Sequence, residues 1–309
     1  MGSVFIAGDW GTSRLRLYLC DGAEVLDRKS GPGAVGAGLA HEAVLFELIA
    51  PWIAEHGPLT VLLCGMVGSR NGWVEAPYVA CPADAAGLSA QLVRFEVQGC
   101  AIGVVPGLKA ISPRQAPDVM RGEETQVIGA LSVLPHLAKG RHLLAHPGTH
   151  TKWVQVEDGQ IVTFQTAFTG EMFALLSTHG TLTNLAAGDA ADLSDGFAEG
   201  LARHERSSAS GLLHELFETR SRQLLDGWSP AHAVNFLSGL LIASDVAGAL
   251  TQFDSAGGPI TIVGDPALSE RYRLALARQG IASELLGGEA CALAGLSALF
   301  QPQAESAPS

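Results

Sequence analysis

The sequence predicts an α/β protein built from two domains of related fold. Apolar runs of strand length, such as residues 59–64, alternate with helical patterns such as residues 42–55. A hairpin pattern near the amino terminus recurs 137 residues further along the chain, which indicates an internal duplication. At 309 residues the chain is long enough for two domains, which we expect to cover residues 1–135 and 136–309.

The first hairpin begins at residue 4. An apolar run ends at Asp9, a turn of Gly11, Thr12 and Ser13 follows, and leucines then alternate with polar residues in the period of a half-buried strand. Glycine lets the backbone approach a ligand closely, and the amides and hydroxyls of the turn suit phosphate oxygens. Asp9 is placed to hold a metal ion through water. Ordinary turn chemistry, which also favours Asp and Gly, is the alternative interpretation.

The second hairpin occupies residues 143–159 and keeps the register of the first. Gly148 and Thr149 correspond to Gly11 and Thr12. Two domains that both open with such a hairpin suggest a duplicated fold that holds phosphates between the two tips.

Three further stretches narrow the comparison. They read CGMVGSRNGW at 64–73, MRGEETQ at 120–126 and PGTHTKW at 147–153. Together with the hairpins they resemble the 2-dehydro-3-deoxygalactonokinase family of the actin-like ATPase and sugar kinase superfamily, over about residues 4–300. The resemblance implies two actin-like (ribonuclease H-like) domains with an ATP and substrate cleft between them. It also implies transfer of the γ-phosphoryl group of ATP, with Mg²⁺, to the 6-hydroxyl of 2-dehydro-3-deoxy-D-galactonate in galactonate catabolism.

The loop after the strand at 59–64 is the predicted substrate site, because ligands of open α/β sheets bind at the carboxyl ends of strands. Arg70 offers a planar fork that suits a carboxylate. Asn71 can donate to and accept from sugar hydroxyls, and Trp73 gives an apolar face. A surface loop with an incidental arginine is the alternative interpretation.

The candidate base lies at the start of a predicted helix over residues 123–134. Acidic residues in a first turn complement the helix dipole, so Glu123 and Glu124 also have a purely structural explanation. Gly-Glu-Glu before an apolar helix resembles the polyphosphatase branch of the superfamily, in which a glutamate of this pair acts on the attacking group. That match points to Glu124, with Asp118 as the second candidate.

Three positions of the second half remain open. His146 stands where the first copy has Asp9 and cannot replace a carboxylate on hydrated magnesium, so we expect metal binding to rest on Asp9. Lys152 contacts either a phosphate or solvent, since it lies on an alternating strand. Glu171 either binds substrate hydroxyls or caps a helix.

Glycine marks two other segments. Residues 27–39 are glycine-rich and predict a loop. The amides around residues 33–36 are, with Lys152, the next candidates to read the substrate carboxylate. By resemblance, the strand, turn and helix around Gly264 and Asp265 hold the adenosine.

Composition limits the functional classes. Apolar residues make up 47% of the chain, which allows substantial cores. Nineteen basic and 31 acidic residues give a net charge of −12, which offers no basic stripe for nucleic acid. The five cysteines are scattered without a Cys-x-x-Cys pair, which argues against disulfides and structural zinc. With no signal peptide pattern and no long apolar run, we expect no membrane span and a cytoplasmic enzyme.

Two other functions stay open at this point. A polyphosphatase-like phosphohydrolase would share the hairpin and the Gly-Glu-Glu stretch, but would need a long basic channel that this acidic chain does not indicate. A non-catalytic nucleotide-dependent switch would need partner-binding insertions, which the sequence does not show. The sequence does not reveal the oligomeric state, and a homodimer is one alternative.

Overall fold

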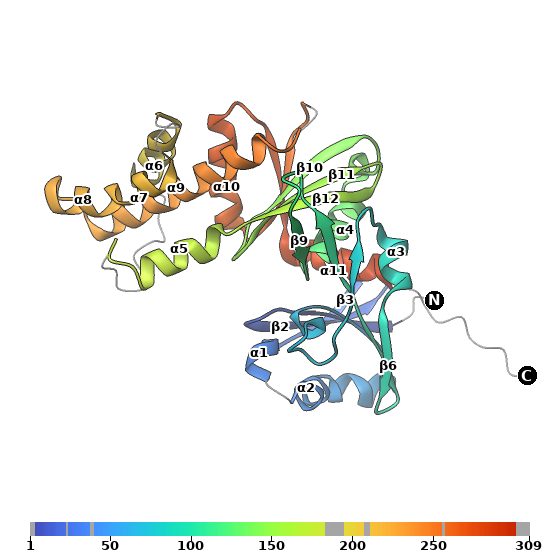
Figure 1. The fold of residues 1–309 in the computed structure, drawn as a ribbon. Coiled ribbons are helices and arrows are strands. Elements are labelled where there is room, and N and C mark those ends of the chain that lie inside the picture. Colours follow the sequence, from blue (N-terminus) through green and yellow to red (C-terminus); the bar gives the residue numbers. More distant parts are fainter. Residues whose placement is uncertain are drawn as a thin grey trace, which may run out of the picture. The chain divides into compact units, whose positions relative to one another are not determined.

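The computed structural model describes residues 4–22, 24–37, 40–182, 195–206, 211–254 and 257–300 (Figure 1). The chain divides into two compact units. The first consists of Met1–Arg141, Val156–Phe164 and Leu286–Ser309, and the second of His142–Gln155 and Gln165–Leu285. The domain boundary between residues 135 and 136 is expected from the sequence repeat. That boundary stays a prediction.

The first unit contains a six-stranded sheet in the order β3-β2-β1-β4-β7-β6. Its strands are β1 (Val4–Trp10), β2 (Arg14–Asp21), β3 (Glu24–Pro32), β4 (Thr60–Gly65), β6 (Val93–Val97) and β7 (Cys100–Val104). The predicted first hairpin is confirmed, because β1 pairs antiparallel with β2. β1 also pairs in parallel with β4, so that Asp9 lies opposite Arg16 on one side and Cys64 on the other.

The loop expected over residues 27–39 is wrong in its first part. The chain forms β3 there, and β3 pairs antiparallel with β2. Gly33 follows β3 and packs against the turn of the first hairpin. A Cβ at Gly33 would lie 2.1 Å from the carbonyl oxygen of Thr12, so only glycine fits. Gly33 therefore allows the backbone after β3 to approach the backbone of the first hairpin turn closely, in addition to allowing the chain to change direction.

The second sheet repeats the arrangement in the order β12-β11-β10-β13-β14. Its strands are β10 (Arg141–His146), β11 (Thr151–Glu157), β12 (Gln160–Ala167), β13 (Ile260–Gly264) and β14 (Ser283–Gly287). In each sheet, three strands that are consecutive in the chain lie side by side, and a later strand pairs in parallel with the first of the three. That later strand is β4 beside β1 in the first sheet and β13 beside β10 in the second. This shared order confirms the α/β class and the duplication that the sequence repeat predicts.

A small sheet in the first unit has the order β5-β8-β9. Its strands are β5 (Tyr78–Ala80), β8 (Gly107–Ile111) and β9 (Pro117–Met120). β9 leads through Arg121 and Gly122 into α4 (Glu123–Val133), the helix that the sequence predicts. The small sheet therefore positions the start of α4.

Helices make up much of both units (Figure 1). The others are α1 (Ala34–Ala37), α2 (His41–His56), α3 (Ala85–Ala90), α5 (Thr169–Thr178), α6 (Asp195–Arg206), α7 (Leu212–Leu216), α8 (Glu218–Leu225), α9 (Pro230–Leu250), α10 (Pro266–Arg278) and α11 (Gly288–Leu299), with 3-10 turns at η1 (Met66–Gly68) and η2 (Pro135–Ala138). The sequence of residues 182–225 is mostly polar and predicts helices with turns between them; two parts of this stretch, 183–194 and 207–210, lie outside the described residues.

Each unit has its own apolar core. In the first unit α2 packs its buried face, which includes Leu45 and Ile49, against the sheet residues Ile6, Leu17 and Leu63. In the second unit α9 lies at the centre. Although α9 has the length and composition of a membrane span, 72% of its apolar window is buried inside the protein, as in the core helix of a globular domain.

Helices α4 and α11 cross at very short range. A Cβ at Gly129 would lie 1.8 Å from the carbonyl oxygen of Cys291, and one at Gly295 would lie 1.9 Å from that of Thr125. Both glycines are therefore required by backbone contact. Since α4 begins with Glu123 and Glu124, this crossing fixes the helix that carries the candidate base.

Candidate active site

Asp9 occupies the penultimate position of β1, just before the predicted phosphate-binding turn. Its Oδ2 accepts a hydrogen bond from Nη1 of Arg16 at 3.3 Å. Burial raises the pKa of Asp9 above its usual 3.8; Arg16 opposes this shift, and the charges of Glu123 and Glu289 add to it. A half-buried carboxylate near other acidic groups is stabilised by a bound cation.

The donor set around Asp9 limits the kind of metal site. Within the described residues, no group of three or more His, Cys, Asp or Glu side chains is arranged to hold a metal ion. Mg²⁺ commonly keeps several waters and takes one or two carboxylates together with phosphate oxygens. The single carboxylate of Asp9 therefore fits a hydrated Mg²⁺ ion whose other ligands are waters and phosphate oxygens.

Glu124 lies in the first turn of α4 and is 0% exposed. Its Oε2 accepts the amide of Gly122 at 2.6 Å, and its Oε1 accepts the hydroxyl of Thr125 at 3.1 Å. Burial, with the neighbouring charge of Glu123, raises the pKa of Glu124 to about 8. A pKa near the operating pH suits a general base. However, both oxygens are already engaged with the chain itself.

Two glycines bring the turns that carry Asp9 and Glu124 together. Gly65 ends β4 and Gly122 precedes α4, and both have positive φ, at 92° and 105°. A Cβ on Gly122 would lie 3.3 Å from the Cα of Gly65, and one on Gly65 would lie 3.6 Å from Oδ1 of Asp9. The fully buried Cys64 lies beside both carboxylates: burial raises its pKa well above the usual value, and the charges of Asp9 and Glu124 add to the shift.

Asp118, the second candidate base, lies on β9 and not in this cluster of glycine turns. It pairs in register with Ala110 of β8. Its Oδ1 accepts the amide of Val119 at 2.8 Å. The geometry associates Glu124, and not Asp118, with the turn next to Asp9.

The turn of the first hairpin is exposed at Thr12 and Ser13. The amide of Gly11 donates to the carbonyl of Arg14 at 3.0 Å, which closes the turn. The Gly11 carbonyl accepts the amide of Ala34 at 2.9 Å. The turn is thus supported from behind, while its two hydroxyls remain accessible.

The predicted substrate loop presents Arg70 and Asn71 to solvent. No ion pair or hydrogen bond engages the Arg70 side chain within the described residues. Trp73 is half-buried, and its ring meets that of Phe95 edge-on at 5.1 Å. Arg70 is therefore available to an anionic ligand, whereas part of the Trp73 ring belongs to the core of the first unit.

Arg121 lies under the same loop. Its Nη2 donates to the carbonyl of Ala76 at 2.7 Å, and its guanidinium group lies 4.4 Å from the centre of the Tyr78 ring. The Nε and Nη1 atoms are buried without a hydrogen-bond partner among the described residues. Nη1 faces Gly68, where a Cβ would lie 3.0 Å away.

The turn of the second hairpin, at Gly148 and Thr149, is held by the start of α5. A Cβ on Gly170 would lie 2.2 Å from the Gly148 carbonyl oxygen, and the amide of Glu171 donates to the Thr149 carbonyl at 2.8 Å. The Glu171 carboxylate pairs with Nε2 of His150 at 2.5 Å. Glu171 therefore lies in the first turn of the helix α5, next to the hairpin turn at Gly148 and Thr149. It does not occupy the N-cap position of α5, which is Phe168.

Lys152 is 4% exposed, so its interpretation as a solvated surface lysine is wrong. The strand β11 is buried along almost its whole length, including the positions that alternation assigned to solvent. Alternation fails here because both faces of this strand are covered.

A cavity of 170 Å³ lies beside the second turn, within the second unit. It is lined by Gly148, Thr169, Gly170, Phe173, Ser238, Leu241, Ile242, Leu268, Arg271 and Tyr272. Arg271 provides its cation and donates to Ser238 Oγ and Asn235 Oδ1, both at 3.1 Å. The lining is otherwise mostly apolar, which suits a flat heterocyclic group.

Gly264 and Asp265 adjoin the same turn. A Cβ on Gly264 would lie 3.3 Å from the carbonyl oxygen of Pro147, the residue before Gly148. Asp265 caps α10, because its Oδ1 accepts the amides of Ala267 and Leu268 at 3.0 and 3.1 Å. The predicted adenosine segment therefore lies next to the second turn, and Asp265 has a structural role there.

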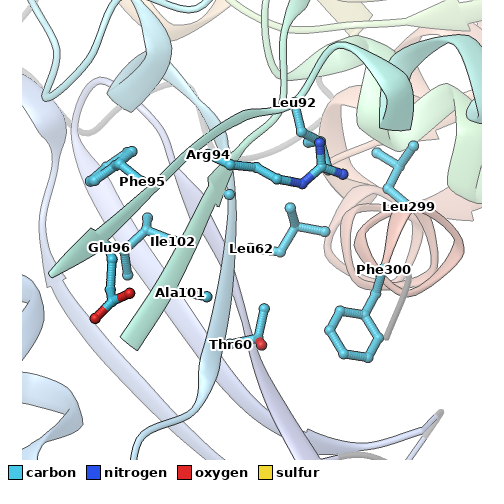
Figure 2. Close-up of a pocket in the computed structure, with 11 residues that line it drawn as sticks. Thr60, Leu62, Leu92, Arg94, Phe95, Glu96, Ala101, Ile102, Leu299 and Phe300 are labelled. Carbon is cyan, nitrogen blue, oxygen red and sulfur yellow. The ribbon is translucent and has the colours of Figure 1, made fainter. Parts of the chain in front are cut away.

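A different cavity, of 320 Å³, lies in the first unit away from these residues (Figure 2). Thr60 and Leu62 of β4, Arg94 of β6 and the end of α11 at Leu299 and Phe300 line it. In the sheet register Thr60 pairs with Phe5, at the opposite end of β1 from Asp9. No predicted site residue lines this cavity.

Several polar residues beside the candidate site residues of each unit were not singled out from the sequence: Arg16, Arg121 and Glu289 in the first unit, and Asp245 and Arg271 in the second. Arg16 was within reach of sequence reasoning, because a hairpin closed between Gly11 and Arg14 places it opposite Asp9. Arg121 belongs to the stretch at 120–126 that the sequence already marks, whereas Asp245, Arg271 and Glu289 reach their neighbours through contacts between distant segments, for which one sequence carries no signal.

Comparison with known proteins identifies the family. The family model of 2-keto-3-deoxy-galactonokinases matches residues 9–299. A probable 2-dehydro-3-deoxygalactonokinase of Rhizobium meliloti (strain 1021) is 36% identical, with 95% of both chains covered. The 2-dehydro-3-deoxygalactonokinase of Escherichia coli (strain K12) is 35% identical, with 96% of this chain and 97% of the other covered.

A solved structure agrees with these relatives. The crystal structure of a candidate 2-dehydro-3-deoxygalactonokinase from Sinorhizobium meliloti matches with a TM-score of 0.87 at 35% identity, covering 96% of this chain and 97% of that one. The agreement therefore extends from sequence to fold over nearly the whole length. The chain belongs to the 2-keto-3-deoxy-galactonokinase family.

Proposed function

We propose that this protein is a sugar-acid kinase that transfers the γ-phosphoryl group of ATP to the 6-hydroxyl of 2-dehydro-3-deoxy-D-galactonate. Identity of 35–36% to the named kinases over nearly the full length is the observation that carries the proposal. The repeated sheets, each with a Gly-Thr turn after its first strand, support it. Because ATP is the phosphoryl donor, we place the enzyme in the cytoplasm.

Phosphoryl transfer depends on positioning and charge neutralisation more than on covalent help. Magnesium, when bound with ATP, neutralises charge that develops on the phosphate oxygens. Asp9 orients that hydrated ion. Thr12 and Ser13 donate to phosphate oxygens from the first turn, with Gly11 giving them room, and Gly148 and Thr149 do so from the second.

Glu124 is the proposed base for the substrate hydroxyl, with Asp118 as the alternative. Its raised pKa and its place beside Gly65 and Gly122 support this choice. Since both of its oxygens are bonded to the chain, proton transfer requires one of these hydrogen bonds to exchange for the substrate. The hydroxyl of Thr125 is the partner best able to exchange, because it can rotate.

Arg70 is the proposed anchor for the sugar-acid carboxylate, and Asn71 for neighbouring hydroxyls. The guanidinium of Arg70 is exposed and has no ion pair or hydrogen bond among the described residues, which supports this role. Trp73 contributes an apolar edge. Glu171, already paired with His150, is proposed to accept from a substrate hydroxyl through its remaining oxygen.

The 170 Å³ cavity is the proposed site of the adenine base, with Gly264 and Asp265 beside the ribose. The apolar lining, the adjacent second turn and the cation of Arg271 support this placement. The homodimer stays a prediction.

Two rival functions give different kinetics. A polyphosphatase-like enzyme would hydrolyse phosphate chains without a sugar acid, and a nucleotide-dependent switch would bind ATP without appreciable turnover. A screen of sugar acids with ATP and magnesium separates the three. ATP turnover that requires a 2-dehydro-3-deoxy acid supports the kinase, whereas equal turnover with and without any acid would exclude it.

A further inference from the structure

Asp245, on α9 in the second unit, collects hydrogen bonds from three other elements. Its Oδ1 accepts from Nε1 of Trp153 on β11 at 2.8 Å. Its Oδ2 accepts from the hydroxyl of Thr169 at the start of α5 at 2.7 Å, and from that of Tyr272 on α10 at 2.5 Å. The Tyr272 hydroxyl also pairs with that of Thr151 at 2.8 Å.

The partners of Asp245 are all buried: Thr151, Trp153, Thr169 and Tyr272 are between 1% and 8% exposed. Burial raises the pKa of Asp245, and the hydrogen bonds from these partners oppose that shift. Hydrogen bonds to a charged acceptor in such surroundings are among the stronger ones in proteins. The orientation of Thr169 is therefore tied firmly to α9.

Thr169 transmits this constraint to the second Gly-Thr turn. The next residue, Gly170, packs directly on the carbonyl of Gly148, and the one after it donates its amide to the carbonyl of Thr149. Gly170 and Glu171, the second and third residues of α5, thus hold the turn, and Thr169 directly precedes them. Thr169 and Tyr272 also line the neighbouring cavity.

We propose that Asp245 is a positioning residue that fixes the second Gly-Thr turn for the phosphates of ATP. It acts through Thr169 and α5 and does not touch the nucleotide itself. The inference rests on the proposed function, in which Gly148 and Thr149 bind phosphate. The two carboxylate oxygens of Asp245 bind different elements: Oδ2 accepts from Thr169 of α5, and Oδ1 accepts from Trp153 of β11. Substitutions that remove one hydrogen bond at a time therefore distinguish an effect on the turn from a general loss of stability.

Two variants interrupt the connection to the turn. Thr169→Val keeps the shape of the side chain and removes the hydroxyl that bonds to Oδ2. Asp245→Asn keeps the size and removes the charge. We expect both to weaken the binding of magnesium ATP by roughly 10-fold or more, the range for losing a hydrogen bond to a charged group. Adenosine, which lacks phosphates, should bind Asp245→Asn within about twofold of the wild type, as should the sugar acid, because Asp245 does not line the cavity.

Trp153→Phe is the matched control, because it removes the hydrogen bond to Oδ1 on the side away from α5. It should lower the melting temperature without changing the ratio of ATP affinity to adenosine affinity. Calorimetric titration of each folded variant with adenosine and with magnesium ATP gives this ratio, and thermal melting gives the stability. Values of kcat and of KM for both substrates complete the comparison.

Three results would overturn the proposal. If Thr169→Val and Asp245→Asn lower the melting temperature but keep the wild-type affinity ratio, Asp245 is only structural. If Trp153→Phe changes the ratio as much as Thr169→Val does, the effect is not carried by α5. If the wild type itself binds ATP no more tightly than adenosine, the phosphate role of Gly148 and Thr149 fails first, and the proposed function is then at fault.

Discussion

At the scale of single residues, the substitution Asp9→Asn tests the proposed role of Asp9 in magnesium binding. Asp9→Asn removes a charge but keeps the side-chain shape and an oxygen for Arg16, so the fold should survive. We expect turnover to fall by at least ~100-fold, the low end for losing one charge-stabilising group. Steady-state kinetics across a magnesium titration measure this. Near-normal turnover with unchanged magnesium dependence would remove Asp9 from the mechanism.

Glu124→Gln tests the assignment of the base. The variant removes proton acceptance, and Gln can still accept from Gly122 while the Thr125 hydroxyl rotates to accept from its amide. We expect kcat to fall by roughly 10²- to 10⁴-fold, with little change in KM for ATP. Asp118→Asn is the comparison variant. Should it show this loss while Glu124→Gln does not, Asp118 is the base.

The same substitution changes how stability depends on pH. The pKa of Glu124 rises from a usual 4.5 to about 8 on folding, so the folded state retains a proton that the unfolded state releases. Between about pH 4.5 and 8 this group therefore makes the free energy of unfolding fall as pH rises, by up to ~1.4 kcal/mol per pH unit. Glu124→Gln should lose that slope.

Melting temperatures of the wild type and Glu124→Gln, measured from pH 5 to pH 8, test this expectation. The difference should move in favour of the variant as pH rises, and level off above about pH 8. A difference that is constant over the range would show that Glu124 is ionised in the folded protein.

Arg70 is tested by two substitutions. Arg70→Ala loses charge and geometry, and Arg70→Lys keeps only the charge, so both should raise KM for the sugar acid, with Ala raising it more. We expect roughly a 10-fold rise for Ala, as for losing a charge-assisted hydrogen bond. ATP affinity serves as the control and should hardly change. An unaltered sugar-acid KM would mean that the carboxylate is read elsewhere, with Lys152 or the amides around residues 33–36 as the next candidates.

At the scale of elements, the crossing of α4 and α11 tests the packing. Gly295→Ala would place a Cβ 1.9 Å from the carbonyl oxygen of Thr125, so the two helix backbones must separate. We expect a loss of about 1–3 kcal/mol or more in the free energy of unfolding. Gly287→Ala is the matched control, because a Cβ there meets nothing within 4 Å. Chemical denaturation of both variants gives the difference, and equal stability would contradict the close crossing.

The elements also show what one sequence can predict. Segments such as α2 and the first hairpin follow from local pattern, because apolar residues recur there at the spacing of a helix or of a strand. β3 was missed because Gly31 and Gly33 indicate a loop in the sequence, whereas a Cβ at Gly31 would lie 2.7 Å from Cδ1 of Leu48 and one at Gly33 would lie 2.1 Å from the carbonyl oxygen of Thr12. Burial of Glu124 and Lys152 depends on neighbours far away in the chain, and the sequence pattern does not contain that information.

At the scale of the whole molecule, the repeated strand order and the family membership support one central claim, that the protein couples ATP consumption to phosphorylation of a sugar acid. The most direct measurement follows ADP release and the sugar product together, with phosphorus NMR locating the new ester. The account predicts one ADP for each 2-dehydro-3-deoxy-D-galactonate consumed, a 6-phosphate as the product, and negligible ADP without the acid. ADP release that continues at the same rate without any sugar acid, or polyphosphate hydrolysis in its place, would contradict it.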